Sequence, residues 1–140
     1  MRTIKKAYLT LGGCGSGKTT LSKKLAKKKN LFHYEYDKRK QYKTDPFTYP
    51  RIILDAWYIT NSDVINGCNQ LIEKGYDVTV IWLKTTDKQR YENIVNRCRK
   101  QGKVYKPWEQ FVKMRSGRVE YQEEELLDYF EKNNIRILYK

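Results

Sequence analysis

The chain has 140 residues with 29 basic and 16 acidic side chains, so its formal net charge at pH 7 is +13. This length predicts a single domain over residues 1–140, large enough to bury about two-thirds of the surface that the unfolded chain exposes. The apolar runs are far shorter than the roughly 18 residues of a membrane span, and the first residues lack the apolar core of a secretory signal. We therefore expect a cytoplasmic protein with no membrane partner, and leave its oligomeric state open.

A phosphate-binding loop is the first feature along the chain. Residues 7–11 (AYLTL) form a short apolar run that predicts a buried parallel strand. Residues 20–29 carry leucines and an alanine at helical spacing, so they predict a helix. Between them lies GGCGSGKTT, which matches the P-loop pattern of a glycine, four residues and then Gly-Lys-Thr. The strand before it and the helix after it are the context that this motif requires.

This loop predicts a site for ATP or another nucleoside triphosphate. Glycines let backbone amides approach phosphate oxygens closely, and the helix that follows adds partial positive charge at its N-terminus. Lys18 is expected to neutralise the phosphates, and the hydroxyl of Thr19 to reach a Mg²⁺ ion. The predicted nucleotide-binding residues are Gly12, Gly13, Cys14, Gly15, Ser16, Gly17, Lys18, Thr19 and Thr20.

Strands and helices alternate along the rest of the chain. Apolar runs predict strands at 31–36, 51–57, 77–83 and 135–139. Apolar residues at helical spacing predict a helix over 62–74. Two more helices are expected to start at the capping box Thr86–Gln89 and at Pro107. Such alternation builds a parallel sheet with helices on both faces. The predicted fold class is therefore α/β, a P-loop NTPase-type three-layer sandwich with a five-stranded parallel sheet.

Two carboxylates end predicted strands and are candidates for the chemistry. Asp55 follows the apolar run at 51–54 and has the form of a Walker B carboxylate that holds magnesium, although a loop carboxylate or helix cap would have the same pattern. Asp37 lies among cations, which favour its ionised form, so it is a candidate base for a hydroxyl proton, with a surface ion pair as the alternative. Both are expected at the rim of the sheet where the terminal phosphate lies.

Positive charge is concentrated in two blocks. Residues 1–43 hold 13 basic and 2 acidic side chains, and residues 84–118 hold 11 basic and 3 acidic ones. Part of the first block is a lysine-rich helix face that solvation alone explains, but a field of this size favours a polyanionic partner. The segment at 90–106 is a basic helix running into Gly102, which predicts a lid whose arginines neutralise charge on the transferring phosphate. Arg90 and Arg97, seven residues apart, are expected on similar faces of this helix.

Together these motifs resemble the phage-type polynucleotide 5'-kinases and the related zeta-toxin-like P-loop kinases. The resemblance covers nearly the whole chain: the loop at 12–19, then Tyr36-Asp37 with Arg39 and Lys40, then the strand ending at Asp55, and then the segment from Arg97 to Pro107. It implies that Asp37 is the base, that Lys40, where arginine is usual, contacts substrate, and that a lid arginine stabilises the transferring phosphate. We predict Arg39, beside Lys40, as a second substrate-binding residue. Gln101 replaces the arginine usual before Gly102, so Arg97 or Arg99 would take that role.

The resulting hypothesis is an ATP- and magnesium-dependent kinase that phosphorylates a hydroxyl on a nucleic-acid end, with Thr19 and Asp55 as the metal ligands. Only 14 residues separate Asp37 from Ile52, which predicts an open acceptor side and favours a polymer over a small nucleoside. The alternatives are a nucleoside, nucleotide or small-metabolite kinase, and, from another class, a nucleic-acid-binding P-loop NTPase with no acceptor.

Overall fold

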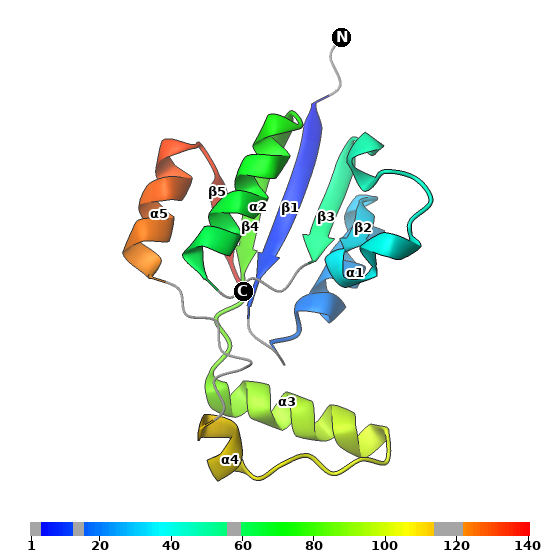
Figure 1. Ribbon diagram of the computed structural model, residues 1–140, viewed down its shortest axis with the longest axis vertical. Helices are drawn as coiled ribbons and strands as arrows, with labels where there is room; N and C mark the ends of the chain where they lie inside the picture. Colours follow the sequence, from blue (N-terminus) through cyan, green and yellow to red (C-terminus); the bar gives the residue numbers. More distant parts are fainter. Residues whose placement is uncertain (1–3, 13–15, 56–59, 114–121) are drawn as a thin grey trace.

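The structure is a computed structural model that describes residues 4–12, 16–55, 60–113 and 122–140, with Asp37 described by its backbone alone. The strands of its sheet are β1 (Lys5–Leu11), β2 (Phe32–Glu35), β3 (Arg51–Asp55), β4 (Tyr76–Trp82) and β5 (Arg136–Tyr139). Every neighbouring pair is parallel, and the order across the sheet is β2-β3-β1-β4-β5. The predicted five-stranded parallel sheet is confirmed (Figure 1).

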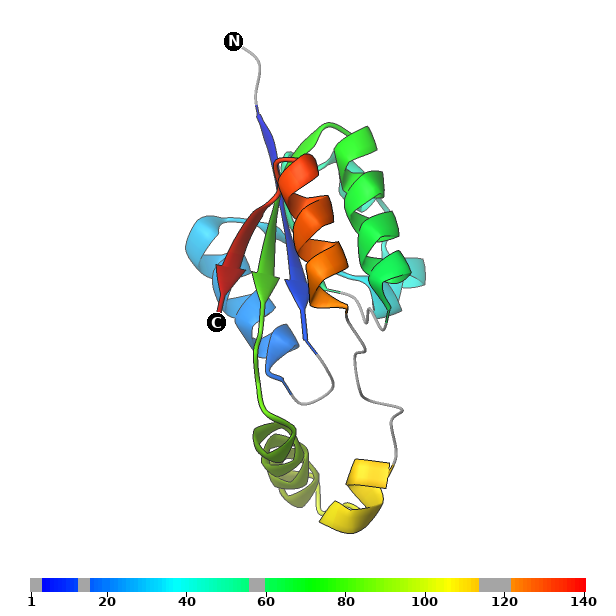
Figure 2. The ribbon, with the colours of Figure 1, turned by 90° about the vertical axis from the view of Figure 1, so that its left-hand side faces the viewer.

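Helices cover both faces of this sheet. The helices among the described residues are α1 (Lys18–Lys29), α2 (Asn61–Glu73), α3 (Asp87–Lys100), α4 (Trp108–Lys113) and α5 (Glu123–Lys132), with two short 3-10 helices, η1 (Tyr36–Gln41) and η2 (Pro46–Thr48). The helix α1 packs on β2 and β3, while α2 packs on β4 and α5 on β5. Figure 2 shows the sheet between these two layers, which confirms the predicted three-layer arrangement.

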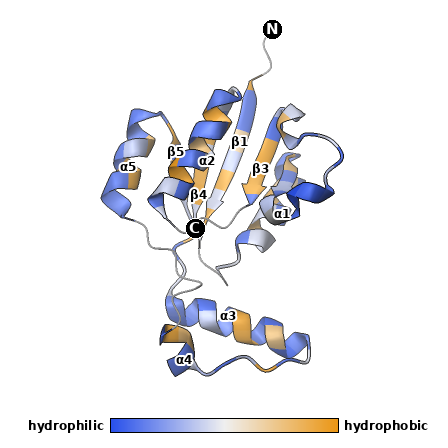
Figure 3. Ribbon diagram, viewed as in Figure 1, coloured by the Kyte–Doolittle hydropathy of each residue, from blue (hydrophilic) through white to orange (hydrophobic). Residues whose placement is uncertain are grey.

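The two sides of the sheet have separate hydrophobic cores. The larger lies under α2 and α5, where Leu9 and Val80 of the sheet meet Val64 and Phe130, all fully buried. The smaller lies under α1, where the partly buried Leu21, Leu25 and Ala26 pack against Leu31, Ile53 and Ile81. Figure 3 shows the matching pattern, with hydrophobic residues concentrated on β3 and β4 and a mainly hydrophilic α5.

The predicted loop follows the central strand β1, on either side of which the chain adds its other strands. From β1 the chain passes to β2 and β3 on one side, and later to β4 and β5 on the other. Ligands of open α/β sheets bind at such a switch point, outside the carboxyl ends of the strands. In Figures 1 and 2 the α3–α4 hairpin lies beyond this same edge. Among the described helices, none combines the length and apolar character that crossing a membrane requires.

Candidate active site

Two glycines of the loop are required by geometry that the structure shows. A Cβ at Gly12 would lie 2.5 Å from the hydroxyl oxygen of Ser16, so any side chain there would push Ser16 out of the loop. Gly17 has a φ of 87°, in the left-handed region, and forms the N-cap of α1. Residues 13–15, which include Cys14, lie outside the described residues. The glycines at both ends of the loop therefore serve its backbone path.

The loop and the start of α1 present hydrogen-bond donors that suit an anionic group. Gly17 offers no side-chain cap, so the amide groups of the first turn of α1 lack the side-chain acceptor that usually satisfies them. The hydroxyl of Ser16 is buried without a hydrogen-bond partner among the described residues. Lys18, Thr19 and Thr20 form that first turn, with Lys18 half-buried and the two threonines exposed. Phosphate oxygens would satisfy these donors, as the sequence predicts for a nucleotide.

Asp55 lies beside this turn at the end of β3, opposite Thr10 of β1. Its side chain is buried, and burial acts to raise the pKa of the carboxyl group. Hydrogen bonds from His33 and Thr19 and the positive charge of Lys18 outweigh that effect and lower the pKa below its ordinary value. The structure therefore brings together the two predicted metal ligands, Thr19 and Asp55, and keeps the carboxylate ionised at neutral pH.

Two polar residues near Asp55 were missed by the sequence-based prediction. His33 Nε2 lies 3.4 Å from Asp55 Oδ2, and Glu35 is the register partner of Asp55 on the neighbouring strand. Both face into the site from β2, and each is half-buried. The available signal was a polar residue at alternate positions of an otherwise apolar strand, which is unusual for a strand covered by a helix.

The predicted substrate-side residues follow β2 in η1. The guanidinium of Arg39 lies 4.3 Å from the ring centre of Tyr36 and donates to the Tyr36 carbonyl oxygen at 3.2 Å. Lys40 is exposed beside it. The side chain of Asp37 lies outside the described residues, so its role as the base stays a prediction. The position of η1, directly after the carboxyl end of β2, is the one expected for contacts with an acceptor.

Comparison with known proteins agrees with this geometry at the level of the fold. The chain matches no protein-family model and none of the curated proteins. It resembles the solved structure of a gluconokinase from Sinorhizobium meliloti 1021, with a TM-score of 0.53 and 13% sequence identity, over 99% of this chain and 83% of that one. At this identity the likeness shows the fold alone, a parallel α/β sheet with helices on both faces. The predicted P-loop α/β class is therefore confirmed, and the subfamily remains a proposal.

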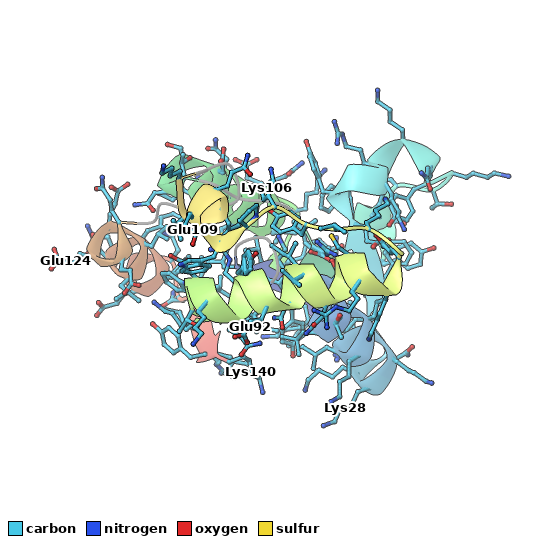
Figure 4. All side chains as sticks on the ribbon, turned by 90° about the horizontal axis from the view of Figure 1, so that it is seen from below. Lys28, Glu92, Lys106, Glu109, Glu124 and Lys140 are labelled. Carbon is cyan, nitrogen blue, oxygen red and sulfur yellow. The ribbon has the colours of Figure 1, made fainter. Side chains whose placement is uncertain are left out.

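The segment predicted as a lid, residues 90–106, lies within the α3–α4 hairpin. Figure 4, viewed from the carboxyl edge of the sheet, shows α3 crossing in front of the rest of the molecule. Arg97 and Arg99 are exposed in the last turn of α3, where they remain candidates for the lid arginine. Arg90, expected on a face similar to that of Arg97, is instead buried: its Nη1 donates to Asp87 Oδ1 at 2.9 Å and its guanidinium lies 5.9 Å from the centre of the Phe111 ring. Arg90 therefore stabilises the hairpin.

A hydrogen bond links the start of the hairpin to the predicted phosphate loop. The hydroxyl of Thr85, just after β4, donates to the carbonyl oxygen of Ser16 at 3.3 Å. Within the hairpin, the hydroxyl of Tyr91 donates to the carbonyl oxygen of Lys106 at 2.8 Å and its ring packs against Trp108 and Phe111. The hairpin thus has an aromatic interior of its own and a direct attachment to the loop.

Proposed function

We propose that the protein is an ATP- and magnesium-dependent kinase. The observation that carries this proposal is the grouping of Lys18, Thr19 and the buried, ionised Asp55 where β1 and β3 end side by side. Lysine charge and loop amides bind phosphates, and a hydroxyl and a carboxylate hold Mg²⁺, which would supply further neutralising charge at the phosphates. The fold-level likeness to a gluconokinase supports the same assignment.

In this reaction the acceptor hydroxyl oxygen bonds to the γ-phosphorus, and the bond from that phosphorus to the β–γ bridging oxygen breaks. The acceptor proton passes to the carboxylate of Asp37. Lys18 and the lid arginines, Arg97 or Arg99, offset the charge that spreads over the transferring group. The products are ADP and a phosphate monoester.

We further propose that the acceptor is a hydroxyl at a nucleic-acid end. Exposed basic side chains occur on α1, which follows the loop (Lys23, Lys24, Lys27, Lys28 and Lys29), on η1, which follows β2 (Lys38, Arg39 and Lys40), and on the last turn of α3 (Arg97, Arg99 and Lys100). Figure 4 shows Lys28 pointing outward from the core. A chain of phosphates makes many contacts with such a surface, whereas a small acceptor makes few.

The connection between β2 and β3 supports an open acceptor side. It consists of the two 3-10 helices and packs onto the sheet edge: the hydroxyl of Tyr42 accepts from the amide of Glu35 at 2.9 Å, and Phe47 packs against Tyr34 and Tyr76. This segment therefore forms no separate covering domain over the site. A polymer end needs none, because contacts outside the site hold it.

A small-metabolite kinase is the second candidate. The observation in its favour is the structural likeness to a gluconokinase, a fold-level similarity at 13% identity. One experiment separates the candidates: [γ-³²P]ATP is incubated with the protein, Mg²⁺ and, in parallel, 5'-hydroxyl RNA, 5'-hydroxyl DNA, a nucleoside, gluconate or water alone. Label on an oligonucleotide supports the main proposal, and label on gluconate or the nucleoside alone supports the second. Release of inorganic phosphate with no labelled acceptor indicates an NTPase and contradicts both.

A further inference from the structure

A cluster of three metal-ligating side chains lies between β2 and β3. His33, Glu35 and Asp55 each direct one ligand atom to within 4.8 Å of the other two. We propose that these residues form a second cation site, separate from the predicted Thr19–Asp55 magnesium site and sharing Asp55 with it, that binds a first-row transition dication through one imidazole nitrogen and two carboxylates. This site concerns metal binding alone, so it does not depend on phosphoryl transfer.

The backbone fixes the three side chains on one face of the sheet. His33 and Glu35 are two residues apart on β2, so they project to the same side of that strand. Glu35 is in register with Asp55 on β3, and parallel partners in register also share a face. The strands belong to the sheet, and Asp55 is buried at its end. The ligands are therefore held by rigid elements, which is what a preorganised metal site requires.

The separation of His33 and Asp55 also suits a shared metal. At 3.4 Å, the hydrogen bond between Nε2 and Oδ2 is longer than the about 2.9–3.0 Å usual for an N–H···O bond, so a cation can replace it. Two ligands at bonds of about 2.1 Å from a tetrahedral or octahedral ion lie about 3.0–3.4 Å apart. A cation placed between these two atoms would therefore need little movement of either side chain.

The charges around the cluster are compatible with a dication. Glu35 and Asp55 supply two negative charges, and the histidine is an uncharged ligand when it binds a metal. Two lysines compete: Lys38 Nζ lies 3.1 Å from Glu35 Oε2, and the charge of Lys18 acts on Asp55. Lys38 is 54% exposed, so its ion pair with Glu35 contributes little and opens readily. Lys18 is the residue proposed to turn toward the nucleotide phosphates.

The nitrogen ligand selects the class of metal. Mg²⁺ takes oxygen ligands and keeps several waters, whereas imidazole suits transition dications, whose affinities rise from Mn²⁺ toward Cu²⁺. Mn²⁺ is the best probe for this chain because it binds thiolates poorly, so the three cysteines do not compete for it. The site should therefore bind Mn²⁺ in preference to Mg²⁺ when no nucleotide is present.

The test is a Mn²⁺ titration of the nucleotide-free full chain, followed by the electron paramagnetic resonance signal of the free ion. We expect wild type to bind Mn²⁺ and both His33→Phe and Glu35→Gln to bind it at least about tenfold more weakly. Glu124→Gln is the matched control, because Glu124 is an exposed carboxylate in the first turn of α5 and should leave the affinity unchanged. Equal affinity in His33→Phe and wild type would overturn the proposal, whatever Glu35→Gln does.

A second measurement needs no variant that must fold. His33 is the single histidine of the chain, so its ring nitrogen-15 resonances are assigned without ambiguity. Addition of Zn²⁺ should shift the Nε2 resonance in the way that direct coordination does, and an unchanged Nε2 resonance at saturating Zn²⁺ would contradict the site. Lys18→Ala separates this inference from the proposed kinase function: it should lose phosphoryl transfer and bind Mn²⁺ no more weakly than wild type.

Discussion

Asn61 and Gln122 are joined by two hydrogen bonds although 61 positions separate them in the chain. The Asn61 Nδ2 donates to the Gln122 carbonyl oxygen at 3.0 Å, and the Gln122 amide donates to Asn61 Oδ1 at 3.1 Å. Asn61 opens α2, and Gln122 is the N-cap of α5, the first described residue after the hairpin. The buried side chain of Asn61 thus fixes the backbone where the chain returns to the sheet.

The first prediction is that Asn61→Ala destabilises the fold. Because both backbone groups of Gln122 lose their partner, the free energy of unfolding should fall by roughly 1–3 kcal/mol. Asn66→Ala, at an exposed position of the same helix, is the control and should have little effect. Urea unfolding followed by circular dichroism measures both, and equal stability of the two variants would show that the paired bonds contribute nothing.

The second prediction concerns Lys18. Lys18→Ala should abolish phosphoryl transfer, because it removes the charge that neutralises the β and γ phosphates, while the circular dichroism spectrum stays that of wild type. Lys132→Ala, exposed on α5, is the control for loss of a lysine elsewhere. A folded Lys18→Ala protein with wild-type turnover would remove the loop from the mechanism.

The third prediction separates Asp37 from Asp55. If Asp37 is the base, Asp37→Asn should lower the single-turnover rate by roughly 10²-fold or more, with ATP affinity nearly unchanged. Asp55→Asn should instead raise the magnesium concentration needed for activity, because the metal loses a ligand. Single-turnover rates measured across a Mg²⁺ titration decide the matter, and an exchange of the two phenotypes would reverse the assignment.

The fourth prediction tests the polyanionic partner. Binding of a single-stranded oligonucleotide should weaken steeply between about 50 and 200 mM salt, because each phosphate that a lysine or arginine neutralises releases counterions. Fluorescence anisotropy of a labelled oligonucleotide measures this dependence. A flat response to salt would argue against a nucleic-acid substrate and in favour of the metabolite kinase.

The fifth prediction follows from the burial of Cys68 in the core. Burial raises the pKa of this thiol to about 12 from its ordinary value of 9.0. Between these values the unfolded chain releases the proton and the folded chain keeps it, so stability is lost as pH rises above about 9, by roughly 1.4 kcal/mol per pH unit. Unfolding measured from pH 8 to 10, below the range where the raised pKa of Tyr129 has the same effect, should show this slope in wild type, and Cys68→Ala should lack it. Equal slopes in the two proteins would contradict the raised pKa.

The strands could be predicted from the sequence because each apolar run is bounded by polar or turn residues. The first residues of the helices were harder to predict, because they are set by the hydrogen bonds and backbone angles of the N-cap. The helix α1 begins at Lys18, two residues before its expected start, since Gly17 adopts a left-handed N-cap that no periodicity reveals. At Thr86 only half of the expected capping box is present: its hydroxyl accepts from the Gln89 amide, while the Gln89 side chain donates to Asn93. The complete box is at Thr60 and Asp63, at the start of α2, where the acidic residue is Asp rather than Glu or Gln.

One contiguous motif allowed a site to be predicted at residues 12–20 from spacing alone, whereas residues brought together by separate strands gave no such signal. The proximity of His33 to Asp55 depends on the register of β2 against β3, and these residues are 22 positions apart in the chain. Arg90 and Arg97 look equivalent in sequence, yet the packing of α4 buries one and leaves the other exposed. Tertiary contacts of this kind decide which charged residues are available for chemistry.

The separate aromatic interior of the α3–α4 hairpin also bears on where a substitution has its effect. Neither hydrophobic core of the sheet includes a residue of the hairpin. The hairpin and the sheet are therefore separate units of packing, and a substitution that loosens the aromatic interior of the hairpin leaves both cores of the sheet in place. The hairpin meets the loop through Thr85, so changes in its packing reach the site through that hydrogen bond before they reach the sheet.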